Sequence, residues 1–86
     1  MGAGWRHCVN PDFDKRVGQN IRLLRREKGW SQDQLSAKLQ VCGCDMTRSA
    51  LAKIEVGQRH VYADEIYLLR EIFGCSFDDL FKKNFR

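Results

Sequence analysis

The sequence has little of what marks a membrane, secreted or disordered chain. Its 86 residues include one proline and no low-complexity run, which argues against disorder. No stretch approaches the roughly 18 consecutive apolar residues that a membrane span needs. Residues 1–10 also lack the apolar core of a signal peptide. We therefore expect one small folded domain that lies in the cytoplasm and does not enter a membrane.

The four cysteines lack the spacing that is typical of a disulfide framework or a structural metal site. A disulfide framework usually belongs to a secreted chain, so we expect the four cysteines to be free thiols. Cys42 and Cys44 could supply two zinc ligands, with Cys8 or His7 as further candidates, or they could sense oxidants. Structural zinc sites usually use a Cys-x-x-Cys spacing, and no second close pair is present. We therefore expect neither a metal nor a cofactor, and we expect Cys75 to pack in the core.

The sequence also lacks the residue sets that carry catalysis. It has no Ser/His/Asp arrangement, no pair of carboxylates in an apolar setting and no phosphate-binding glycine loop. His7 and His60 have no evident catalytic partners in the sequence. We therefore expect a protein that is not an enzyme.

Basic residues are present in excess, and they are unevenly placed. Lys and Arg number 15 against 11 Asp and Glu, which gives a net charge of +4. Residues 1–30 hold seven basic and three acidic residues, whereas residues 61–86 hold four basic and five acidic residues. The positive charge of the first half favours a polyanionic partner, although many proteins with a net charge this small never bind nucleic acid.

Apolar residues recur at three- and four-residue steps along most of the chain, and no stretch alternates strictly as a strand does. This pattern predicts an all-α fold. A flexible N-terminal arm is expected at residues 1–10, the folded domain at 11–81 and a C-terminal tail at 82–86. Helices are expected at about 11–28, 32–40, 47–56, 64–73 and 77–81, on the basis of their capping residues and terminal glycines.

Three spaced groups of residues together resemble the lambda-repressor-like, XRE-type helix-turn-helix family. The first is an Arg-x-x-x-Gly-x-Ser-Gln-x-x-Leu run, the second an Ile-Glu-x-Gly sequence and the third a Gly-x-Ser-x-Asp-x-Leu close. Their residues are Arg25, Gly29, Ser31, Gln32 and Leu35, then Ile54, Glu55 and Gly57, then Gly74, Ser76, Asp78 and Leu80. The resemblance covers residues 14–81 and implies a compact five-helix domain that binds double-stranded DNA.

The resemblance also implies roles for single residues. The helix at 47–56 would enter the major groove, where short or basic side chains at its N-terminal end can approach the base edges. The residues expected to face bases are Thr47, Arg48, Ser49 and Ala52; those expected to contact the DNA backbone are Gln32, Lys53, Arg59 and His60; and Arg25 and Glu55 are expected to form an internal ion pair.

One segment departs from the family pattern. The chain from Leu35 to Glu55 is about five residues longer than usual, and the extra residues are Gln40 to Cys44. We expect a lengthened turn at residues 41–45 in place of the family's tight turn.

The simplest function is a repressor that binds as a homodimer to a two-fold symmetric site, with Phe81 and Phe85 as candidates for the dimer surface. The alternative is a protein-interaction module that keeps the fold without reading DNA. A face of the helix at 47–56 that is small and basic, with no acid outside Glu55, favours the first function.

Overall fold

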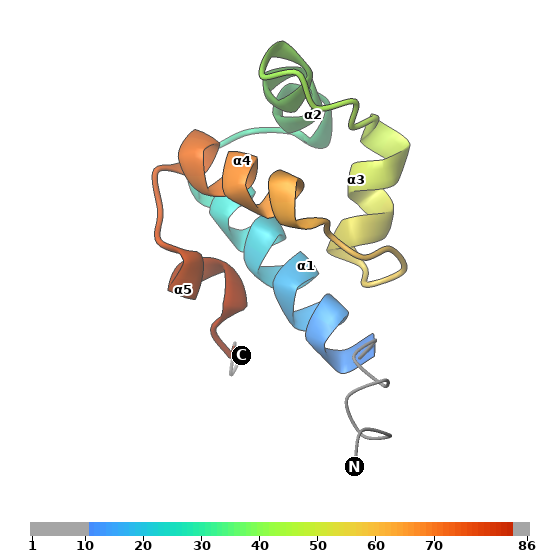
Figure 1. The fold of residues 1–86 in the computed structure, drawn as a ribbon, viewed down its shortest axis with the longest axis vertical. Coiled ribbons are helices and arrows are strands. Elements are labelled where there is room, and N and C mark those ends of the chain that lie inside the picture. Colours follow the sequence, from blue (N-terminus) through green and yellow to red (C-terminus); the bar gives the residue numbers. More distant parts are fainter. Residues whose placement is uncertain (1–10, 84–86) are drawn as a thin grey trace.

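The computed structural model describes residues 11–83, which form five α-helices and no strand (Figure 1). The helices are α1 (Pro11–Glu27), α2 (Gln32–Val41), α3 (Arg48–Glu55), α4 (Ala63–Phe73) and α5 (Phe77–Phe81). The predicted all-α fold is confirmed, and each helix boundary lies within about one residue of its expected position. The expected arm at residues 1–10 and the last residues of the expected tail lie outside the described part of the chain.

Side-chain caps mark where α2 and α3 begin. Ser31 starts α2 with a capping box, in which its Oγ accepts from the backbone N–H of Gln34 and its own N–H donates to the Gln34 side chain. Thr47 caps α3 by accepting from the backbone N–H of Ala50. At the C-terminal end of α4, Gly74 adopts the left-handed conformation with φ of 67°.

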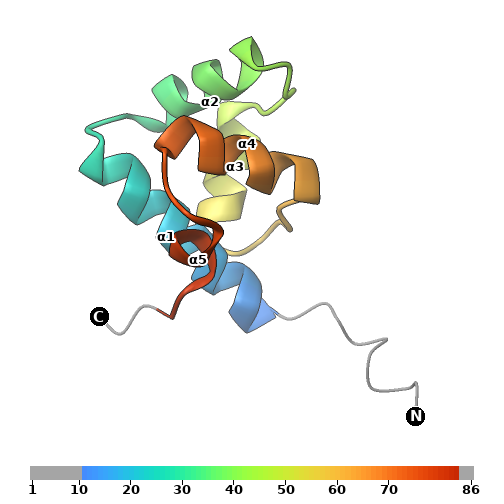
Figure 2. The ribbon, with the colours of Figure 1, turned by 60° about the vertical axis from the view of Figure 1, so that its left-hand side comes forward.

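Helices α2 to α5 are arranged around α1 (Figures 1 and 2), and the core lies between the five helices. Its buried apolar side chains come from every helix and from the turn before α3. They are Val17, Ile21, Leu35, Leu39, Met46, Leu51, Ile54, Ile66, Leu69, Phe73 and Leu80. Asn20 is buried among them, and its amide donates to the backbone carbonyls of Leu80 at 2.9 Å and Lys82 at 2.8 Å. This amide therefore fastens the end of α5 to α1.

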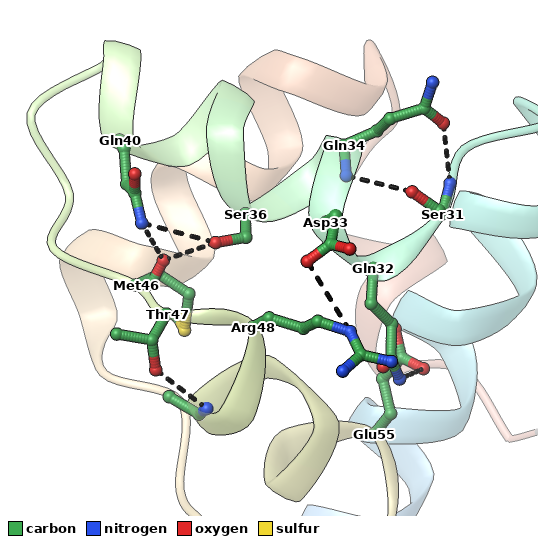
Figure 3. A network of polar contacts seen from close by, with 11 residues as sticks. Ser31, Gln32, Asp33, Gln34, Ser36, Gln40, Met46, Thr47, Arg48 and Glu55 are labelled. Carbon is green, nitrogen blue, oxygen red and sulfur yellow. Dashed lines mark hydrogen bonds and ion pairs between the residues drawn. The ribbon is translucent and has the colours of Figure 1, made fainter.

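The lengthened turn between α2 and α3 is held at both ends. After Gly43, which has φ of 89°, the backbone N–H of Cys44 donates to the carbonyl of Leu39 at 2.9 Å. Met46 is fully buried, and its carbonyl accepts from Ser36 Oγ at 2.7 Å and from Gln40 Nε2 at 2.9 Å (Figure 3). The additional residues therefore leave the start of α3 fixed to α2 and to the core.

Within the described range, 11–83, no helix has both the length and the apolar character needed to cross a membrane.

Candidate nucleic-acid interface

Helix α3 has one face fixed in the core and one face open to solvent. Leu51, Ile54 and Glu55 are buried. At the other side, Thr47, Arg48, Ser49 and Lys53 are exposed, whereas Ala52 is half-buried. The exposed residues begin at the N-terminal end of the helix and include two bases and no acid. The structure thus places three of the four expected base-facing residues, Thr47, Arg48 and Ser49, at the start of α3, and the fourth, Ala52, one turn further along.

A bidentate ion pair joins α1 to α3 below this face. Arg25 Nε lies 2.7 Å from Glu55 Oε2, and Arg25 Nη2 lies 3.0 Å from Glu55 Oε1. Arg25 Nη1 also donates to the carbonyl of Trp30 at 2.8 Å. Both charged side chains are buried, with exposed fractions of 10% and 2%. The two residues that the sequence resemblance placed in an internal ion pair therefore meet with good geometry.

Gln32 belongs to the same network (Figure 3). It is the first residue of α2, and its Nε2 donates to Glu55 Oε1 at 3.0 Å. Since a glutamine amide nitrogen carries two N–H groups, this bond leaves the second for another acceptor. The half-buried side chain is therefore oriented by Glu55 at the N-terminal end of α2.

Arg59 and His60 lie in the connector between α3 and α4, and both meet carboxylates. Arg59 makes two parallel bonds of 3.0 Å to Glu65, while its guanidinium lies over the Tyr62 ring. His60 Nδ1 lies 2.7 Å from Asp14 Oδ2 on α1. Two of the four residues expected to contact the DNA backbone are thus held by acidic partners within the domain, while 28% and 49% of their side-chain surfaces stay exposed.

Glu65 is nearly buried, and its pKa reflects competing influences. Burial by itself raises the pKa of this carboxyl, but hydrogen bonds from Arg59 and from the backbone N–H of Tyr62 outweigh burial, and the pKa lies below its usual value. The same contact raises the pKa of Arg59, because its hydrogen bond to Glu65 favours the charged guanidinium. Both groups are therefore charged near neutral pH.

The cysteines do not assemble a metal site within the described residues. Cys42 is exposed, whereas Cys44 and Cys75 are half-buried against the core, and all three are free thiols. Burial raises the pKa of the Cys44 and Cys75 thiols. Among residues 11–83, no group of three or more His, Cys, Asp or Glu side chains could hold a metal ion. Cys8 and His7, which were possible further ligands, lie outside the described residues.

Several residues that shape the interface were not identified from the sequence. Ser36, Met46, Glu65 and Asn20 are buried, and Asp33 Oδ1 lies 3.5 Å from Arg48 Nε. A signal for Met46 was available, because it directly precedes the cap of α3 and pairs with Leu51 in the spacing of a hydrophobic staple. The partners of Asn20 and Asp33 lie on other elements, and no local pattern indicates them.

Known proteins resemble this chain in sequence and in fold. The family described as helix-turn-helix matches residues 21–80. An uncharacterised HTH-type transcriptional regulator of Sinorhizobium fredii, y4dJ, is 32% identical over 69 residues, which span 80% of this chain and 83% of that protein.

Two solved structures share the fold. The DNA-binding domain of BldD has a TM-score of 0.71 at 20% identity, covering 85% of this chain and 99% of that domain. The hypothetical transcription factor NHTF from Neisseria has a TM-score of 0.70 at 22% identity, covering 87% of this chain and 82% of that structure. The geometry of α2 and α3 and the match over residues 21–80 lead to one conclusion: the chain belongs to the XRE-type helix-turn-helix family of DNA-binding transcription regulators.

Proposed function

We propose that this protein binds double-stranded DNA by inserting the N-terminal end of α3 into the major groove. One observation carries the proposal: the exposed start of α3 bears short polar and basic side chains, while the opposite face of the same helix is fixed in the core. A major groove admits one α-helix, and bulky aliphatic side chains at this end would hold it away from the bases.

The side chains of α3 suit different parts of a base pair. Arg48 can make a bidentate pair with the O6 and N7 atoms of guanine, a contact that is worth about 1–3 kcal/mol of discrimination. The hydroxyl groups of Thr47 and Ser49 can bond to base edges, and the methyl group of Ala52 can contact a thymine methyl. Lys53, one turn further along, suits a phosphate.

The phosphate contacts would come from residues on both sides of α3. The second amide N–H of Gln32 and the free backbone N–H groups at the start of α2 can bind one phosphate together. Arg59 bonds to Glu65 through Nη1 and Nη2, so its Nε is not part of that contact. His60 meets Asp14 through Nδ1, so its Nε2 is not part of that contact. We propose that these carboxylates orient both side chains so that the remaining donors face the DNA backbone.

Selection of binding sites from random duplex DNA tests this function. The protein should enrich a defined sequence, and Arg48→Ala should abolish or relax the preference at one position. Lys53→Ala should instead weaken binding to all sequences similarly and reduce the slope of log affinity against log salt by about 1. Equal affinity of the wild type and Arg48→Ala for the selected site, or no enrichment at all, would contradict this function.

We further propose that the protein acts in the cytoplasm as a homodimer on a two-fold symmetric site and that it represses by occupying that site. A palindromic sequence in the selection, with two chains bound for each duplex in light scattering, is the expected result. A reporter gene placed behind the selected site should lose expression when the protein is present. No catalytic step is part of this proposal.

A protein-interaction role is the second candidate, and a groove on the domain favours it. The groove has a volume of about 480 Å³ and lies where α1, α4 and α5 meet. Four of its nine lining residues are aromatic, and two of them, Phe77 and Tyr67, are 42% and 54% exposed. Phe81 also lines the groove, but its ring stacks on that of Phe13, with 5.8 Å between the ring centroids. This candidate for the dimer surface therefore already has a partner within the domain. Phe85 lies outside the described residues.

A further inference from the structure

An acidic side chain lies beside the arginine that we expect to read a base. Asp33 belongs to the first turn of α2 and Arg48 is the first residue of α3. Asp33 Oδ1 lies 3.5 Å from Arg48 Nε, and the two side chains face each other across the space between the helices (Figure 3). Both remain open to solvent, with exposed fractions of 75% for Asp33 and 65% for Arg48.

A carboxylate at this place acts against general DNA binding. It lies on the surface that offers Gln32 and the α2 amides to a phosphate, and a phosphate repels it. An acid in the first turn of a helix is favourable for the helix dipole. That benefit does not require the carboxylate to reach across to α3, so the contact with Arg48 needs a separate explanation.

The atoms in contact suggest what the pair does. Asp33 lies nearest to Nε of the guanidinium group. The two terminal nitrogens, Nη1 and Nη2, together form a different edge of the same planar group. Those two nitrogens can bond to O6 and N7 of a guanine at the same time. An arginine with several rotatable bonds binds a base more selectively when a neighbour already fixes its orientation.

We propose that Asp33 is a specificity-determining residue that positions Arg48 for guanine. The proposal rests on the proposed function, because it requires α3 to lie in a major groove. Asp33 need not touch DNA in this arrangement: it lowers affinity for all sequences slightly by its charge and raises the preference for guanine at the position that Arg48 reads.

Site selection and competition binding with the full chain test the proposal. The position that Arg48 reads is first identified as the one where Arg48→Ala loses its preference. At that position, and at the same salt concentration, Asp33→Ala should reduce the preference for guanine over other bases by about two- to five-fold, the range expected for an exposed ion pair. Its affinity for unrelated duplex DNA should stay equal or rise.

Two comparisons separate positioning from other effects of the substitution. Asp45→Ala removes an exposed acid from the turn before α3 without touching Arg48, so it should leave the base preference unchanged. In an Arg48→Ala background, Asp33→Ala should have no further effect on base preference. Thermal melting of each variant shows whether the domain still folds.

The possible failures are distinct. If the wild type enriches no sequence, the proposed function itself is overturned, and the inference is overturned with it. If the wild type enriches a site and Asp33→Ala keeps the full guanine preference, the inference alone is overturned. A loss of preference at a different position that persists without Arg48 would mean that Asp33 reads a base directly, for example a cytosine amino group, and would also overturn it.

Discussion

Gly18 determines how closely α1 approaches the C-terminal end of α3. A Cβ atom at this position would lie 2.0 Å from the carbonyl oxygen of Ile54 and 3.0 Å from that of Glu55. Because both neighbours are backbone atoms, no side-chain rotation can make room. The absence of a side chain on α1 therefore sets the depth at which α3 sits, and with it the position of the expected DNA-reading face.

Gly18→Ala should therefore destabilise the domain. The added methyl group would push α1 and α3 apart, at a cost of about 1–3 kcal/mol or more, even though alanine favours a helix by up to about 1 kcal/mol over glycine. Urea unfolding followed by circular dichroism measures the change. Gln19→Ala, on the exposed side of the same turn, is the control and should change stability by less than about 0.5 kcal/mol. Equal stability of the two variants would contradict the close approach at Gly18.

Glu65 contributes stability that depends on pH. Its pKa in the folded chain lies below the ordinary glutamate value of 4.5 because Arg59 and the Tyr62 N–H stabilise the charged form despite burial. A carboxyl whose pKa is lowered by folding stabilises the folded state above its unfolded-state pKa. That stabilisation is lost as the pH falls through the lower, folded-state pKa.

Glu65→Gln should therefore be clearly less stable than the wild type at pH 7, and the difference should shrink as the pH falls below about 4.5. Thermal melts at a series of pH values measure it. Glu71→Gln is the matched control, since Glu71 lies on the same helix and makes an exposed ion pair with Arg70; its effect should be small at every pH. A difference between wild type and Glu65→Gln that stays constant from pH 7 to pH 3 would rule out the charged pair as its source.

At the scale of the elements, the segment between α2 and α3 decides whether α3 has a fixed place. A longer turn would ordinarily loosen the angle between two helices. Here the buried Met46 side chain enters the core, and the Met46 carbonyl binds Ser36 and Gln40 of α2. The extra length is confined to the residues before Met46, so α3 starts from an anchored point.

Met46→Ala should cost about 2–5 kcal/mol, the usual range for truncating a fully buried methionine. It should also weaken specific DNA binding more than the loss of folded protein explains, because the start of α3 loses its anchor. Val41→Ala is the control at the other end of the turn, where the side chain is 88% exposed, and it should be nearly neutral. Unfolding curves and binding isotherms of the two variants check this; a neutral Met46→Ala would mean that the turn is not anchored there.

At the scale of the whole molecule, internal ion pairs join elements that lie far apart in the sequence. The described residues place charged contacts between elements: Arg25 with Glu55 joins α1 to α3, and Asp14 with His60 joins α1 to the connector before α4. No metal-binding group forms among residues 11–83. A chelator such as EDTA should therefore leave the melting temperature of the full chain unchanged. A large fall would indicate that Cys42 and Cys44 bind zinc together with ligands outside the described residues.

Local patterns in the sequence were sufficient for the helices. Ser31, Thr47 and Ser76 accept from backbone N–H groups within three residues, and Gly74 ends α4 in a conformation that suits glycine. These are contacts within a single turn, so their residues appear together in the chain. The same holds for the exposed start of α3, which follows from the helical period and the cap at Thr47.

The environment of single polar and charged residues depended on the fold. We expected Gln32, Arg59 and His60 to contact phosphates. In the structure, each of them contacts a carboxylate of the domain. Two of these carboxylates, Glu55 and Asp14, are 23 and 46 residues away in sequence. No periodicity encodes which polar side chains meet across such separations, since this depends on how the helices pack together.

The sequence by itself determined the five helices and the small, basic face of α3, because helix caps, glycine ends and apolar periodicity act over a few residues. It also indicated the family, through the spaced motifs that resemble XRE-type helix-turn-helix proteins. The tertiary structure decided three other features: the anchoring of the lengthened turn by Met46, the close approach at Gly18 and the placement of Asp33 beside Arg48. Each of these depends on the distance between helices that pack together, and packing distance is a property of the assembled core.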